Sequence, residues 1–173
     1  MKMTERIRSL FHRMIEFDRG DPDLIQHFTK VYSYASLIAQ SEQLEAHLTE
    51  VLEAAALVHD IAIPLCNRKY GSHPGNLQEL EGPPLVRELL RDLPFDEAET
   101  GRICQLVGEH HTTVPVDGID HQILLEADFL VNSFENSYTA EKIVSVYDQV
   151  FKTAAGRSIY ATMFNLPRGH ATE

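Results

Sequence analysis

The chain has 173 residues, 43% of them hydrophobic, which is enough to bury the core of one globular domain. With 26 acidic and 15 basic residues its net charge is −11, which argues against nucleic acid polymers and anionic membrane surfaces as partners. No apolar run approaches the ~20 residues of a membrane-spanning helix. Two cysteines are too few for a disulfide framework and match no zinc spacing, so a cytoplasmic protein is expected.

The first forty residues predict two amphipathic helices. Residues 4–18 place apolar side chains at i, i+3 and i+4 spacing. Asp21 followed by Pro22 is a typical helix start, and the segment behind it has one apolar side. His27 lies beside Phe28 on that side, so its ring is expected to point inward at the edge of the core.

A histidine and an aspartate, His59 and Asp60, stand side by side at the end of the next apolar run. We expect a helix over residues 43–63 that ends at Pro64, with the pair in its last turn. A buried carboxylate beside a buried imidazole is costly unless the two are paired or bind a metal. An isolated His-Asp doublet occurs often by chance, so other helices must supply further ligands.

Residues 64–82 are rich in turn-forming residues and predict a long loop, a kind of segment that is often functional. Arg68 and Lys69 in this loop are candidates to contact a phosphate, the alternative being that both are solvated cations. His73 is not expected to be a ligand. A short helix is expected to begin at Pro83-Pro84 and to reach about residue 93.

The remaining chain predicts four more helices and no alternating strand pattern, so the fold is expected to be all-α. The first begins at Asp96, which is followed by Glu99 in a capping-box pattern, and ends at His110-His111, before residues 112–115. The second covers residues 118–135 and holds Asp128 in an apolar stretch. The others cover about 139–152 and 157–165, and they either complete the core or form a dimer face.

Four expected helices thus each place a histidine or an aspartate in or beside an apolar face. Each buried ionisable group costs free energy unless it is paired. Mixed imidazole and carboxylate ligands suit Zn, Fe, Mn or Ni, and Mg where carboxylate and water dominate. The alternative is a buried hydrogen-bond network without a metal.

The order His27, then His59-Asp60, then a distant Asp128 resembles the HD-domain superfamily of metal-dependent phosphohydrolases. The resemblance covers about residues 20–135 and implies a compact helical bundle. The whole chain, residues 1–173, would then be a single HD-type domain, with the first and the last helices packed on that core. The resemblance also implies that these four residues hold one divalent metal ion.

A second metal ion is implied by His110-His111-Thr112-Thr113, which resembles the subgroup that holds two. Asp60 would bridge the two ions, which can be Fe, Mn, Ni, Zn, Co or Mg. Glu81 stands before Gly82-Pro83, where related sequences carry histidine, and would be an oxygen ligand. The alternative for Glu81 is a helix-start charge that the helix dipole stabilises.

The resemblance implies a hydrolase in which a metal-activated water cleaves a small phosphorylated metabolite, such as a nucleotide or a dinucleoside polyphosphate, with Asp60 as the catalytic residue. Ile63 stands where some nucleotidases and guanosine-tetraphosphate hydrolases of the family carry glutamate, which counts against those activities. The alternatives are a non-catalytic regulatory domain that binds metal or nucleotide, and a di-iron oxygenase. A monomer and a homodimer are both compatible with the sequence.

Overall fold

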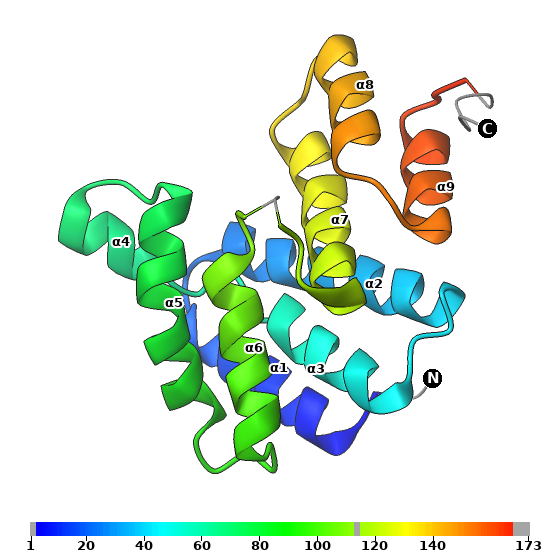
Figure 1. Cartoon of the computed structure of the whole chain (residues 1–173). Coiled ribbons are helices and arrows are strands. Elements are labelled where there is room, and N and C mark those ends of the chain that lie inside the picture. The colour runs from blue at the N-terminus through cyan, green and yellow to red at the C-terminus, as the bar shows by residue number, and fades with distance from the viewer. Residues whose placement is uncertain (1–2, 113–114, 168–173) are drawn as a thin grey trace.

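The computed structural model describes residues 3–112 and 115–167, and these form nine helices and no strand (Figure 1). This confirms the all-α expectation. The helices are α1 (Glu5–Phe17), α2 (Pro22–Ser41), α3 (Ala46–Ala56), α4 (Ile63–Tyr70), α5 (Gly75–Leu90), α6 (Glu97–Glu109), α7 (Gly118–Glu135), α8 (Ala140–Gln149) and α9 (Ala154–Met163).

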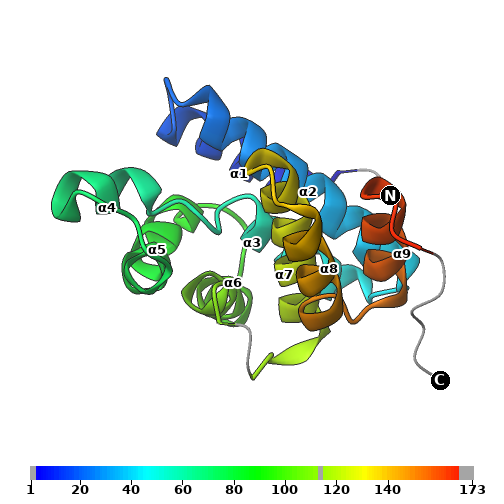
Figure 2. The same cartoon turned by 90° about the horizontal axis from the view of Figure 1, so that it is seen from above.

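Helices α2, α3 and α7 form the centre of the molecule. The most extensive helix pairs are α2 with α7 and α5 with α6, and α3 contacts α2, α6 and α7. Figures 1 and 2 show α4, α5 and α6 on one side of this centre and α8 and α9 on the other. Within the described ranges 3–112 and 115–167, no helix combines the length and the apolar character needed to cross a bilayer.

Three predicted helix starts are confirmed by their hydrogen bonds. The Asp21 carboxylate accepts from the backbone N–H of Leu24 at 3.1 Å, directly before Pro22. Asp96 and Glu99 form both bonds of the capping box, at 2.8 and 2.7 Å. Thr139 caps α8 as expected. These short polar signals hold because they satisfy N–H groups that have no partner inside the helix.

The expected helix over residues 43–63 is wrong at its end. Helix α3 stops at Ala56, residues 57–62 form successive turns, and α4 then begins at Ile63 with Pro64 in its first turn. Proline is tolerated in a first turn because the N–H that it lacks has no helical partner there. Pro64 therefore starts a helix, and His59 and Asp60 lie on turns between two helices.

The expected long loop over residues 64–82 is also wrong. Only residues 71–74 separate α4 from α5, and Gly71 ends α4 in the left-handed conformation at φ 75°. Pro83 and Pro84 lie inside α5 instead of opening a helix. Proline normally breaks a helix interior, so packing of α5 along α6 overrides the local preference here.

The last two helices contribute to the core, which is one of the two roles that the sequence left open. Phe151 and Tyr160 are fully buried in the main hydrophobic cluster, with Ile143 and Val146 at its edge. Helix α9 begins three residues earlier than expected because Thr153 caps it. Thr113 and Val114, where the sequence predicts a helix stop, lie outside the described residues.

A buried carboxylate fastens these helices to α7. Glu126 is fully buried and accepts from the backbone N–H groups of Lys152 and Thr153 at 2.6 and 2.8 Å, from Gln122 at 2.8 Å and from the Thr153 hydroxyl. A Cβ added to Gly156 would stand 1.9 Å from Glu126 Oε2. Close packing around Glu126 thus requires a glycine in the first turn of α9.

Replacing Gly156 by alanine is expected to lower the free energy of unfolding by about 1–3 kcal/mol, because the new methyl group displaces a carboxylate that four hydrogen bonds hold in place. Gly101→Ala is the control: it too replaces a helical glycine, but nothing lies within 4 Å of the added Cβ. That change should stabilise by about 0.5–1 kcal/mol. Urea unfolding of both variants checks this, and a neutral Gly156→Ala would contradict it.

Candidate metal centre

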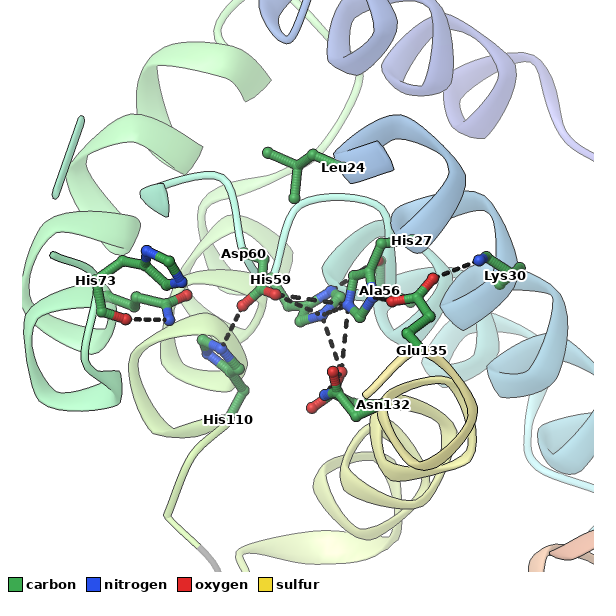
Figure 3. Close-up of polar contacts among 12 residues, drawn as sticks. Leu24, His27, Lys30, Ala56, His59, Asp60, His73, His110, Asn132 and Glu135 are labelled. Atoms are coloured by element: carbon green, nitrogen blue, oxygen red, sulfur yellow. Dashed lines mark hydrogen bonds and ion pairs between the residues drawn. The ribbon is translucent and has the colours of Figure 1, made fainter. Parts of the chain in front are cut away.

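Three helices and one turn segment bring six ionisable side chains together, and Figure 3 labels four of them: His27, His59, Asp60 and His110. His27 comes from α2, Asp128 from α7, and His59 and Asp60 from the turns between α3 and α4. His110 and His111 directly follow the last residue of α6. All are buried except His111, with between 0% and 8% of each residue's surface exposed.

The first group consists of His27, His59, Asp60 and Asp128. The two Nε2 atoms of His27 and His59 lie 3.1 Å apart. The Asp128 Oδ1 atom lies 3.3 Å from the first and 3.4 Å from the second. Asp60 Oδ2 lies 3.5 Å from His27 Nε2. Two imidazole nitrogens and two carboxylates therefore converge on one point from three directions.

The second group consists of Asp60, His110 and His111. His110 Nε2 lies 3.0 Å from Asp60 Oδ1, the carboxylate oxygen that is turned away from the first group. The rings of His110 and His111 lie side by side, with their centroids 3.9 Å apart. The ligand atoms of this group, like those of His27, His59 and Asp60, all lie within 4.8 Å of one another. Asp60 belongs to both groups.

The buried histidines are oriented by hydrogen bonds to their other ring nitrogen. Nδ1 of His59 lies 3.0 Å from the carbonyl oxygen of Ala56, and Nδ1 of His110 lies 2.7 Å from that of Val107. Since a carbonyl only accepts, each Nδ1 carries a proton and each Nε2 atom faces the centre. Such bonds fix a metal-binding imidazole in its productive tautomer.

His27 is oriented by a carboxylate that the sequence analysis missed. Its Nδ1 atom lies 2.8 Å from Glu135 Oε2, and Glu135 also pairs with Lys30 (Figure 3). Asn132 donates to Asp128 Oδ1 at 2.8 Å. Asn132 and Glu135 stand four and seven residues after Asp128 on the same face of α7, so their helical spacing is the signal that could have found them.

Charge inside the centre is arranged so that the histidines attract protons or cations. Burial disfavours a charged imidazole at His27, but Asp128, Asp60 and Glu135 outweigh it and raise the pKa of His27 to about 9. Burial likewise opposes charge at His110, and Asp60 raises the pKa of that ring. Burial also opposes ionisation of Asp128, yet His27 and His59 hold its pKa well below the usual range.

The donor set fits a divalent metal ion. Imidazole nitrogens with carboxylate oxygens suit Fe, Mn, Co, Ni and Zn, and the Nε2 atoms of His27, His59 and His110 already face one another and the carboxylates. His27, His59, Asp60 and Asp128 would hold one ion, while Asp60, His110 and His111 would supply ligands to another.

The structure does not bring Glu81 to this centre. Its carboxylate bonds the Lys69 ammonium and the Tyr70 hydroxyl, each at 2.6 Å, and so joins α5 to α4. Arg68 and Lys69 both lie exposed in the last turn of α4. His73 bonds Asn67, and Glu126 points to the C-terminal helices, as its position about 200° from Asp128 on α7 predicts.

Comparison with known proteins agrees with this arrangement. A family model of the HD domain matches residues 24–152, more than half of the chain. The chain belongs to the HD-domain family. Its structure is similar to the crystal structure of a predicted HD superfamily hydrolase from an uncultured Thermotogales bacterium, with a TM-score of 0.66 and 23% identity. That match covers 91% of this chain and 84% of the other, and at this identity it concerns the fold. Among curated proteins, none matches this chain significantly.

Glu135→Gln is expected to weaken binding of the first metal ion by about tenfold, because a neutral amide is a poorer acceptor for the Nδ1–H of His27 and makes that ring a weaker ligand. Calorimetric titration of the metal-free protein with Mn²⁺ measures the dissociation constant. Glu88→Gln is the control, since Glu88 is exposed and pairs only with Arg91 on the surface. Equal affinities in all three proteins would contradict an orienting role for Glu135.

Metal binding near neutral pH is expected to release a proton. With a pKa of about 9, His27 is protonated in the metal-free protein, and that proton must leave before Nε2 can bind a cation. Affinity should therefore rise with pH up to about 9, by roughly tenfold per pH unit for each proton displaced. Titrations in buffers of different ionisation enthalpy count the protons, and a pH-independent affinity would refute the expectation.

Proposed function

We propose that this HD-domain protein is a metal-dependent hydrolase that cleaves phosphate ester or anhydride bonds in a small metabolite. Family membership supports a hydrolase in general. The observation that carries the proposal is that the carboxylate of Asp60 is shared between two groups of metal-binding side chains. A shared carboxylate sets two cations close together, which is the arrangement suited to in-line displacement at phosphorus.

The residues of the centre have distinct tasks in this reaction. Bound cations would supply an activated water nucleophile at neutral pH and would offset the charge of the phosphoryl oxygens. Asp60 fixes the separation of the two groups, while the carbonyls of Ala56 and Val107 hold the rings of His59 and His110 in place. Asn132 holds Asp128 in the same way.

Charge and accessibility support a phosphorylated substrate. His111 is exposed, so the centre is open to solvent on the side of the second group. Arg68 and Lys69, at the end of α4, are the proposed phosphate contacts, although Lys69 would first have to leave Glu81. A nucleotide or a dinucleoside polyphosphate carries phosphoryl groups, which two metal ions and the basic side chains of Arg68 and Lys69 would bind.

The test is release of phosphate from a panel of nucleotides, dinucleoside polyphosphates and phosphosugars. The protein is stripped of metal and reloaded in turn with Mn, Fe(II), Co, Ni, Zn and Mg. Asp60→Asn is expected to lower turnover by at least about a hundredfold, because an amide cannot supply the shared negative charge. Asp60→Ala removes both oxygens and serves as the second variant.

Asp92→Asn is the matched control. Asp92 is exposed and has φ 64°, a conformation that asparagine also adopts readily, so this change should leave turnover unaltered. Turnover that requires metal and disappears with Asp60 supports the hydrolase. Tight metal binding without turnover on any substrate would favour a regulatory domain, and oxygen consumption by the iron-loaded protein would favour an oxygenase.

A further inference from the structure

Gln78, in the first turns of α5, is a buried polar side chain that the site described above leaves unexplained. Only 4% of its surface is exposed. Its Nε2 atom donates to the carbonyl oxygen of His73 at 2.8 Å. Its Oε1 atom is buried and has no hydrogen-bond partner among the residues that the structure describes. A buried carbonyl left without a partner costs about 1–3 kcal/mol, so a ligand at this oxygen would explain its position.

The identity of the free atom is fixed by chemistry. The His73 carbonyl can only accept a hydrogen bond, so the Gln78 atom beside it must be the amide nitrogen. The oxygen therefore points the other way. An amide oxygen without a partner accepts hydrogen bonds or binds a cation, and it is a common ligand of hard divalent ions.

The helical position of Gln78 shows what this oxygen faces. Gly75 packs against His111, since an added Cβ would lie 2.7 Å from that ring, and Glu81 reaches α4. At about 100° per residue, Gln78 lies about 60° from each of them. It points between the end of α6 and the last turn of α4, where Glu81 bonds Lys69 and Tyr70.

The end of α6 carries two members of the second group, since His110 and His111 directly follow that helix. The third member, Asp60, lies 3.0 Å from His110 Nε2. Figure 3 shows His73 and His110 on the same side of Asp60, with the bond to the His73 carbonyl dashed. The second group as described has three ligands, of which His111 is exposed. Three protein ligands leave coordination positions that a further side chain or water can fill.

We propose that Gln78 is a ligand of the second cation, which its amide oxygen binds together with Asp60, His110 and His111. Gln78 thereby takes the place on α5 that the sequence analysis gave to Glu81, one turn away. With Gln78 the second site would have two nitrogen and two oxygen ligands, as the first has. The inference rests on the two-cation site of the proposed function.

The experiment counts and titrates bound Mn²⁺, a cation that prefers oxygen ligands. Wild-type protein is expected to bind two ions per chain. Gln78→Leu should keep the affinity of the first ion and weaken the second by at least about tenfold, the usual cost of losing a ligand or its support. Elemental analysis after desalting gives the stoichiometry, and calorimetry gives the two dissociation constants. The spin-coupled electron paramagnetic resonance signal of paired Mn²⁺ should disappear as well.

Two further variants separate ligation from packing. Gln78→Met has nearly the length of glutamine and a thioether that Mn²⁺ does not bind, so it should behave like Gln78→Leu and tests the proposal if the leucine variant folds poorly. Gln78→Glu retains an oxygen and should retain the second ion, although repulsion from the His73 carbonyl will lower its thermal stability.

Gln122→Leu is the matched control. Gln122 also donates through Nε2 to a backbone carbonyl at 2.8 Å, that of Val150, but it lies beside Glu126 on another side of α7. It should keep both cations with wild-type constants while losing stability.

Two results would overturn the proposal: two Mn²⁺ ions with unchanged constants in folded Gln78→Leu or Gln78→Met, or a single ion in the wild type. Failure of the proposed function is distinguishable. A wild-type protein that binds two ions and hydrolyses nothing refutes the hydrolase and leaves the role of Gln78 intact.

Discussion

One buried carboxylate, that of Asp60, sits between the two histidine groups on which the centre is built. Removing a carboxylate from water is unfavourable unless opposite charge or hydrogen bonds replace the solvent. One of its oxygens faces His110 and the other faces His27. Helix α2, which carries His27, and the end of α6, which carries His110, must therefore both reach Asp60. Asp60 lies in the segment that connects α3 to α4. The interruption of the helical path at residues 57–62 is what exposes Asp60 to both groups.

The supporting bonds come from helix ends. Ala56 is the last residue of α3 and Val107 lies in the last turn of α6, so their carbonyls have no partner within their own helices. In each case the histidine three residues further on supplies the missing N–H. The negative end of the helix dipole also favours a cation held beside those rings. The same hydrogen bond, from a histidine Nδ1 to the carbonyl three residues before it, thus occurs at the ends of both α3 and α6. In both places it turns the Nε2 atom of the ring toward the centre.

The sequence alone predicts the metal-binding residues of the centre, but it does not predict the residues that support them. His27, His59, Asp60, His110, His111 and Asp128 stand out because ionisable residues on apolar faces are costly, and the structure brings these six together. Glu135 was missed because it looks like an ordinary solvated residue at a helix end. Gln78 was missed because a lone glutamine carries no signal until the partner of its amide nitrogen is known.

The errors in the helix boundaries have a related cause. The sequence predicts that a helix ends at Pro64 and that another begins at Pro83-Pro84. Proline occurs both at helix starts and after helix ends, and packing decides which of the two applies. The burial of α5 along α6 is a long-range contact, so no window of sequence contains it. Capping residues such as Asp96 were predictable because each acts on N–H groups within three residues.

The contact between α5 and α6 sets a limit on how this chain can vary. A side chain at Gly75 would press on His111, and one at Gly82 would press on Val107, each within 2.7 Å. These glycines are seven residues apart and define two points of a closely spaced helix pair. Any larger residue at either point would push α5 and α6 apart and would move the end of α6, which carries both His110 and His111. Positions 75 and 82 should therefore tolerate substitution as poorly as the ligands do, although neither carries a group that can bind a cation.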